Sequence, residues 1–359
     1  MSEHPTAAPP PVDSGTAAAT AGRAPTPGPV PPAERKGGLT AVLSHPAGRD
    51  IGLVLALALL VAVGVYTSGD RFASGNNLMT ILRLASVIGV VAIGMTFVIT
   101  GGGIDLSVGA IVALSSVWAT TLATQTMAGD THWSVMVFAA LAVGAGCGLV
   151  NGTLIAYGRL APFIATLAMF AAARGLAEII AQRRTQIVTV RPFLDFFGGS
   201  VLGVPVLVII WVLVCVLGWV LLNRTVFGRR TLAVGGNAEA ARLAGIDVRR
   251  HTTLLYVLLG LACGLAALML TARTTTGSST HGQLYELDAI AAVVIGGTLL
   301  SGGRGTIVGT VLGVLIFTTL TNVFTLNNLD ISTQAVAKGA IIVAAVLLQQ
   351  RVARRSGSG

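Results

Sequence analysis

Long apolar runs dominate the sequence from residue 51 onward. The first of them, residues 51–67, contains no charged side chain, and similar runs recur at short intervals toward the C-terminal end. A helix needs about 20 apolar residues, each adding about 1.5 Å, to cross the hydrocarbon core of a bilayer. The runs therefore predict helices embedded in lipid.

Composition supports an all-α membrane protein. The chain is 53% hydrophobic and only 10% charged, whereas soluble domains carry about 25% charged residues. A closed β-barrel also satisfies the backbone in lipid, but its strands alternate polar and apolar residues, and Ile51 to Val65 do not alternate. We expect a polytopic transmembrane helical bundle.

The apolar runs predict about ten spans, with both termini in the cytoplasm. The predicted spans are residues 51–67, 79–100, 104–125, 134–157, 162–182, 204–222, 253–272, 288–301, 305–325 and 333–350. The weakest is 288–301, which is short and ends in a glycine cluster, so a re-entrant segment is the alternative to a full span.

The basic residues support this topology, because Lys and Arg gather in cytoplasmic loops. The predicted inside segments hold Arg23, Arg35, Lys36, Arg49, Arg159, Arg224, Arg229, Arg230, Arg242, Arg249, Arg250, Arg304, Arg351, Arg354 and Arg355. The predicted outside segments hold only Arg71, Arg183, Arg184, Arg191 and Arg273. The excess on one side favours the ten-span arrangement.

The chain divides into a tail, a membrane domain and a short polar end. Ten of the thirteen prolines lie before residue 50, which predicts a disordered cytoplasmic tail at residues 1–45, without the features of a cleaved signal peptide. Residues 46–352 form the transmembrane domain, including a polar loop at about 223–252. Residues 353–359 form a short polar tail.

Several other functions are disfavoured by the residue content. The formal charge of +9 is spread among loops without interleaved aromatic side chains, unlike a nucleic-acid-binding surface. Cys147, Cys215 and Cys263 lie in apolar stretches without ligand-like spacing, so no metal site is expected. Neither Lys36 nor Lys338 follows the glycine spacing of a phosphate-binding loop, so the chain is not its own P-loop ATPase.

A glycine-rich break interrupts the sequence Gly94–Gly109. Gly101-Gly102-Gly103 should end one helix, and Asp105 should lie in the first turn of the next, where its carboxylate caps free N–H groups. Because a carboxylate at bilayer depth is costly, Asp105 could also line a polar path or gate. Both interpretations remain open.

The polar stretch Asn223–Arg250 predicts a short helix on the cytoplasmic side. Asn237 suits an N-cap, Glu239 the first turn, and Gly245 the end of a helix. One interpretation is a basic loop that binds lipid headgroups; the other, which we favour, is a small helix that docks in another protein's groove.

Two further stretches are mainly explained by capping and packing. Tyr285–Gly305 begins with acids at a predicted helix N-terminus and ends in small residues that allow close helix contacts. The stretch in which Asn151-Gly152 is followed by Arg159–Leu167 predicts a tight turn between helices, and Pro162 suits the start of a span. The pairs Gly102-Gly103 and Gly302-Gly303, each followed by Val-Gly at the same offset, hint at an internal repeat.

Taken together, these blocks resemble the ribose-type permeases of bacterial ABC sugar importers. The resemblance covers about residues 50–350. One departure lies at Ile246–Arg249, which lacks the proline that follows the coupling loop in ABC importers generally. The matching residues are Gly94–Gly109 with Gly102, Gly103 and Gly109; Asn151-Gly152 with Pro162–Leu167; Glu239-Ala240-Ala241 with Gly245; and Tyr285–Gly305 with Gly296, Gly297, Gly302 and Gly303.

The resemblance implies a multi-pass permease subunit of the bacterial plasma (inner) membrane that is not itself an enzyme. Its expected partners are an ABC ATPase subunit with two nucleotide-binding domains, an extracytoplasmic sugar-binding protein, and a second permease subunit, in a homodimer as the first expectation. The chain binds no cofactor, and the ATPase uses ATP and Mg. The substrate is a monosaccharide, with a pentose such as ribose or xylose as the leading candidate.

The expected site residues fall into two groups. The ATPase-coupling loop is assigned to Gly236, Asn237, Glu239, Ala240, Ala241 and Gly245. An uncharged sugar needs hydroxyl and amide partners, so the translocation path or gate is assigned to Asp105, Ser107, Asn151 and Thr166.

Two other functions were weighed against the permease. An ion-coupled secondary transporter for a small polar solute would use intramembrane acids, for which Asp105, Glu178 and Asp288 are the candidates. A membrane-embedded enzyme is disfavoured because no histidine falls within a predicted span and no hydrolase motif occurs.

Overall fold

The computed structural model describes residues 46–341 and 343–344, which are almost entirely helical. The predicted tails at 1–45 and 353–359 lie outside the described residues. The helices are α2 (Pro46–Ser68), α3 (Asp70–Ala73), α4 (Gly75–Thr100), α5 (Val108–Ala119), α6 (Leu122–Asp130), α7 (Ser134–Ala156), α8 (Pro162–Ala181), α9 (Arg191–Gly198), α10 (Val206–Arg224), α11 (Val226–Gly236), α12 (Ala238–Leu243), α13 (Val248–Thr274), α14 (Tyr285–Ile295) and α15 (Ile307–Leu326). Residues 331–341 are helical as well.

Seven helices within the described part are long and apolar enough to cross a membrane: α2, α4, α7, α8, α10, α13 and α15. An eighth span is formed if α5 and α6 count as one, although they are bent by 54° at Thr120-Thr121. The predicted span 288–301 is wrong in its extent, because α14 has only 11 residues and stops before Gly296. The last predicted span, 333–350, lies only partly within the described residues.

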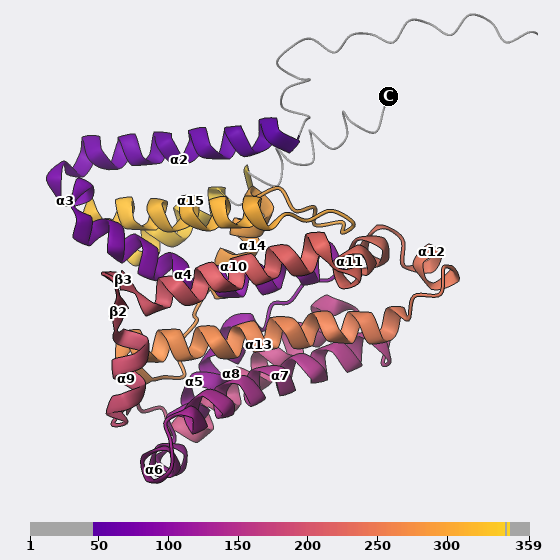
Figure 1. The fold of residues 1–359 in the computed structure, drawn as a ribbon, viewed down its shortest axis with the longest axis horizontal. Coiled ribbons are helices and arrows are strands. Elements are labelled where there is room, and N and C mark those ends of the chain that lie inside the picture. Colours follow the sequence, from indigo (N-terminus) through magenta and orange to yellow (C-terminus); the bar gives the residue numbers. More distant parts are fainter. Residues whose placement is uncertain (1–45, 342, 345–359) are drawn as a thin grey trace, which may run out of the picture. The chain divides into compact units, whose positions relative to one another are not determined.

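Burial separates a central pair of helices from a surrounding set. We compared the most apolar 18-residue stretch of each long helix. In this stretch 83% of the residues of α4 and 67% of those of α13 are buried, whereas only 17% of those of α2 are buried. Figure 1 shows these helices running side by side, with α13 between the layer of α4 and α10 and the layer of α7 and α8. Apolar faces that remain exposed on α2, α8 and α10 suit contact with lipid or another subunit.

Close backbone contact joins α7 to α13. Gly144 and Gly148 lie one turn apart on α7, and a Cβ atom at either would lie 2.2 Å from a carbonyl oxygen of α13. Small residues at this spacing let membrane helices approach closely and pack backbone against backbone. Asn151-Gly152 continues the same row within α7, and the predicted turn between helices lies at residues 157–161, directly before Pro162.

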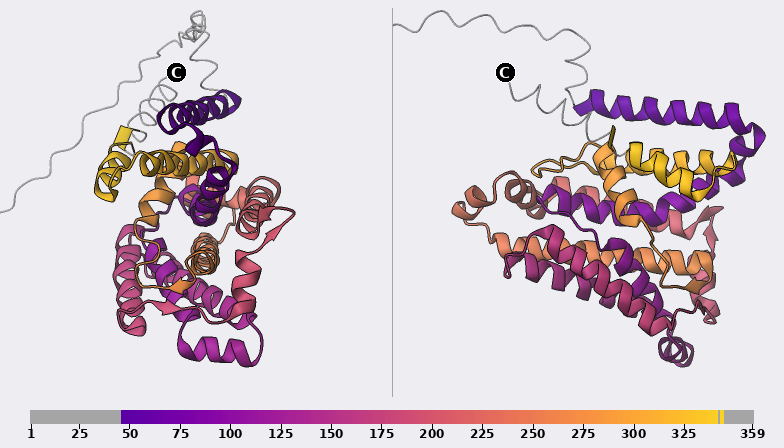
Figure 2. Two further views of the ribbon diagram at one scale, coloured as in Figure 1. Left: turned by 90° about the vertical axis from the view of Figure 1, so that its left-hand side faces the viewer. Right: turned by 180° about the vertical axis from the view of Figure 1, so that it is seen from behind.

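The helix ends gather into two regions. Figures 1 and 2 show α11 and α12 at one end of the bundle, and α3, α6 and α9 at the other. At the latter end, β1 (Gln186–Ile187) pairs with β4 (Thr276–Gly277), and β2 (Ser200–Val201) pairs with β3 (Val204–Pro205). The β1–β4 pair ties the segment after α8 to the segment after α13.

Candidate coupling and gating site

The predicted docking helix is α12. The Asn237 side chain accepts a hydrogen bond from the backbone N–H of Ala240 at 2.9 Å, and Glu239 lies in the first turn. The helix ends at Leu243, and Gly245 follows with a φ of 84°, a left-handed conformation that favours glycine. The structure therefore confirms the short helix and both of its ends.

Glu239 and Arg242 give α12 an exposed, fixed charge pair. Arg242 Nη2 lies 2.6 Å from Glu239 Oε1, and its Nε also donates to the same carboxylate at 3.1 Å. The hydrogen bond and the positive charge of Arg242 lower the pKa of Glu239 from its ordinary value. The carboxylate is consequently ionised at physiological pH, and its side chain is exposed.

The chain on both sides of α12 is tied to the bundle. Asp247 caps α13 by accepting from the N–H of Arg250 at 3.0 Å. On α13 itself, His251 Nε2 lies 2.9 Å from the hydroxyl of Thr231 on α11. His251 falls inside a candidate span, contrary to the prediction, because α13 begins five residues before the predicted apolar run.

The glycine-rich break after α4 has the predicted turn but a different position for Asp105. Helix α4 ends at Thr100, and Gly102 has a φ of 83°. Asp105 is not in the first turn of α5, which begins at Val108. Instead its Oδ1 accepts from both the backbone N–H and the hydroxyl of Ser107, at 2.7 and 2.6 Å. The local turn competes successfully with a helical cap.

Three of the four predicted path residues meet in one buried network. Asn151 Nδ2 donates to Ser107 Oγ at 2.9 Å and to Asp105 Oδ2 at 3.3 Å, and none of the three residues is more than 1% exposed. Thr166 is also buried, but its hydroxyl donates to the Pro162 carbonyl within α8. The network joins the loop after α4 to α7.

The helix endings after α4 and α14 have the same hydrogen-bond pattern. In Gly101–Gly103, directly after α4, the three backbone N–H groups donate in turn to the carbonyls four, three and five residues earlier in the chain. The three N–H groups of Gly296–Thr298, directly after α14, donate to carbonyls at the same separations. The middle residues, Gly102 and Gly297, have φ values of 83° and 86°. The structural equivalent of Gly102 is therefore Gly297, not Gly302 as the shared Val-Gly offset suggested.

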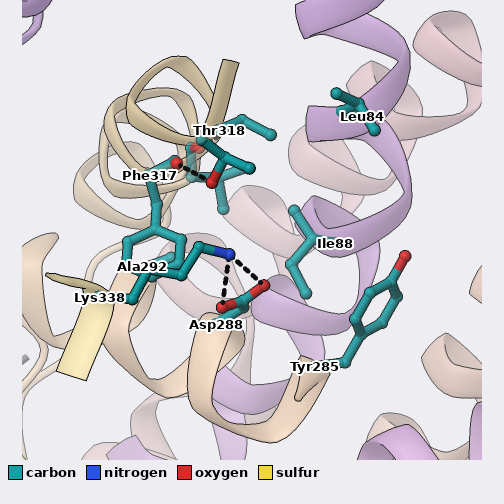
Figure 3. A pocket seen from close by; sticks show the side chains of 10 residues that line it. Leu84, Ile88, Tyr285, Asp288, Ala292, Phe317, Thr318 and Lys338 are labelled. Carbon is teal, nitrogen blue, oxygen red and sulfur yellow. Dashed lines mark hydrogen bonds and ion pairs between the residues drawn. The ribbon is translucent and has the colours of Figure 1, made fainter. Parts of the chain in front are cut away.

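The intramembrane acids that an ion-coupled transporter would need have separate partners. Asp288 lies 3.4 Å from Lys338, whose ammonium group also lies over the ring of Phe317, as Figure 3 shows. Glu178 pairs with Arg183 at 3.6 Å at the exposed end of α8. Among the described residues, neither acid shares a hydrogen bond or an ion pair with Asp105.

A second polar cluster lies at the end of the bundle opposite α12. His281 Nδ1 lies 2.8 Å from Ser116 Oγ, which also accepts from Thr271 at 3.1 Å. Arg174 of α8 donates to the His281 carbonyl at 3.0 Å. The sequence analysis missed this cluster, although a serine and an arginine inside otherwise apolar helices were the available signals.

Comparison with known proteins gives consistent matches over most of the chain. Residues 77–346 match the family model described as "Branched-chain amino acid transport system / permease component". The chain is 45% identical to the ribose import permease protein RbsC of Bacillus subtilis (strain 168), over 84% of this chain and 93% of the relative. No solved structure gives a significant match.

Other similar proteins are named for related sugars. The L-arabinose ABC transporter permease protein AraH of Azospirillum brasilense is 38% identical, over 89% of this chain and 92% of the relative. The D-allose transport system permease protein AlsC of Escherichia coli (strain K12) is 36% identical, over 84% and 92%. The family match at residues 77–346 includes most of α4 and every element from α5 to α15, with both glycine-rich breaks and α12.

Proposed function

This chain belongs to the branched-chain amino acid transport system permease family, in its ribose-type ABC sugar permease branch, and we propose that it forms the translocation path of an ATP-driven importer for a pentose. It is a multi-pass protein of the bacterial plasma membrane. The similar proteins named for ribose, arabinose and allose support a monosaccharide importer permease. The choice of a pentose such as ribose or xylose rests on the 45% identity to a ribose permease.

The energy for transport comes from a separate ATPase subunit with two nucleotide-binding domains, which uses ATP and Mg. The exposed helix α12 carries this part of the proposal, because its capped ends and fixed Glu239–Arg242 pair present a rigid surface for a protein groove. In this arrangement α12 and both termini face the cytosol. A binding protein delivers the sugar to the opposite face.

The path lies between two copies of the permease. Nucleotide-driven movement of α12 switches the opening of this path from one side of the membrane to the other, which requires different contacts in the two states. We assign Asp105, Ser107 and Asn151 to the gate. Their side chains are completely buried, so sugar can reach them only after α5 moves relative to α7. Thr166 lies near the start of α8 and is assigned to the same gate.

The energy source can be tested in cells that express the permease with its ATPase and binding protein. Uptake of labelled pentose should continue when a protonophore collapses the proton gradient and should stop when ATP is depleted. An ion-coupled transporter would show the reverse sensitivity. Competition by unlabelled ribose, xylose, arabinose and allose in the same assay ranks the substrates, and a preference for a non-sugar solute would contradict the proposal.

A further inference from the structure

Three breaks in the helices meet at the end of the bundle that carries α12. They are Gly101–Gly103 after α4, Gly235-Gly236 at the end of α11, and Gly302–Gly305 between α14 and α15. We call the three segments together, with Thr100, the glycine junction. The segments lie far apart in the sequence, and the coupling loop supplies one of them.

The junction is packed backbone against backbone. A Cβ atom at Gly235 would lie 1.8 Å from the Thr100 carbonyl oxygen, and one at Gly302 would lie 2.8 Å from the Cα of Gly102. A Cβ atom at Gly303 would lie 2.9 Å from the Cα of Gly236. These distances leave no room for a methyl group unless the backbone moves.

Hydrogen bonding and conformation hold the same contact in place. The N–H of Gly303 donates to the Thr100 carbonyl at 2.9 Å, which joins the α14–α15 break directly to the end of α4. Gly102, Gly302 and Gly303 have φ values of 83°, 82° and 75°. Glycine adopts this left-handed region without the steric cost that other residues incur.

The position of Gly235-Gly236 gives the junction a mechanical consequence. Gly236 is followed immediately by Asn237, the cap of α12, so a displacement of α12 pulls on the segment that touches both other breaks. Side chains absorb small movements by changing rotamers, whereas a backbone contact has no such freedom. Packed interfaces of this kind switch between discrete arrangements.

We propose that the glycine junction transmits movement of α12 to the α4–α5 and α14–α15 breaks at the same time. Gly235, Gly303 and Thr100 are positioning residues for transport. They act on the buried Asp105 network, which lies in the loop directly after Gly103, and on α14, which precedes the other break. This inference rests on the proposed function, since it assumes that α12 receives force from an ATPase.

The first test uses single methyl groups. In proteoliposomes with the ATPase and binding protein, Gly235→Ala should lower sugar uptake by roughly tenfold or more, while the ATPase still co-purifies and hydrolyses ATP. Gly146→Ala on α7 is the matched control, because its Cβ meets nothing within 4 Å. Gly236→Ala, whose nearest neighbour would be 3.9 Å away, should cause a smaller loss.

A second pair of variants covers the case in which Gly235→Ala does not fold. A Cβ atom at Gly305 would lie 1.9 Å from the Thr100 hydroxyl oxygen, so Gly305→Ala should also impair uptake. Adding Thr100→Ala removes that oxygen and should restore part of the uptake. Recovery in the double variant identifies a local steric effect at the junction.

The two proposals fail in different ways. If wild-type uptake does not depend on ATP, the proposed function is wrong. If wild-type uptake depends on ATP but Gly235→Ala transports as well as Gly146→Ala, or if Thr100→Ala fails to relieve Gly305→Ala, the junction does not transmit the movement.

Discussion

Buried polar side chains hold the loop after α4 in its position. Asp105 would be costly in an apolar interior without partners, and Ser107 and Asn151 supply three hydrogen bonds to its two oxygens. The sequence assigned Asp105, Ser107 and Asn151 to the same path or gate, but it did not predict the hydrogen bonds among them. The contact with Asn151 joins residues 46 positions apart, so no local pattern could reveal it.

Asn151→Ala should destabilise the protein by about 1–3 kcal/mol, because it removes a donor from both Ser107 and the buried carboxylate. The measurement is the thermal unfolding temperature of the purified protein in detergent. Thr153→Ala on the same helix is the control, since its exposed hydroxyl bonds only to carbonyls of α7. Equal unfolding temperatures for the two variants would show that the network contributes little.

The Asp288–Lys338 pair leads to a second prediction. Both side chains are less than 20% exposed, so Lys338→Met should leave an unpaired buried carboxylate and cost about 3–5 kcal/mol. The double variant Asp288→Asn/Lys338→Met should regain most of the lost stability in the same thermal unfolding measurement. A double variant no more stable than Lys338→Met would mean that the charges are not energetically coupled.

Close glycine contacts join several of the helices in this protein. The rows on α7 and α13 allow backbone contact, and the shared endings of α4 and α14 allow both chains to turn sharply. The sequence showed the glycine clusters that end helices, because three in succession break the periodicity. It did not show the α7–α13 contact, since spacing alone does not tell which helix is the neighbour.

Gly148→Ala should weaken the α7–α13 contact by about 1–3 kcal/mol, because its Cβ would lie 2.2 Å from the Tyr256 carbonyl oxygen. Gly146→Ala, two residues earlier on the same helix, has open space and should not lower stability, because alanine favours the helix over glycine. Unfolding temperatures of the two purified variants provide the comparison. Equal unfolding temperatures for the two variants would mean that the close contact at Gly148 does not limit stability.

Helix α12 can be tested separately from the bundle. Glu239→Lys should abolish sugar uptake while the amount of protein in the membrane, measured by immunoblot, stays the same, because the exposed residue contributes little to folding. Glu239→Gln keeps the side-chain length and separates the loss of charge from its reversal. Normal uptake by Glu239→Lys would remove the coupling role from α12.

The molecule as a whole was predictable to different depths. Apolar runs were enough to indicate an all-α membrane bundle, and capping residues located α12 to within a residue at each end. Spans that bend or stop early were harder to predict. Helices α5 and α6 bend by 54° between them, and α14 stops after 11 residues at Gly296-Gly297. The contact between Ser116 and His281, like that between Asp105 and Asn151, joins residues far apart in the sequence. No local sequence pattern predicts such a contact.

The most direct measurement places α12 relative to the membrane and to the ATPase. A cysteine introduced at the exposed residue Ala244 is treated with a membrane-impermeant maleimide, with the unmodified chain and its three native cysteines as background. We predict labelling only in inside-out vesicles, and reduced labelling when the partner ATPase is bound. Labelling of Ala244→Cys from outside intact cells would contradict the topology and, with it, ATP-driven coupling through α12.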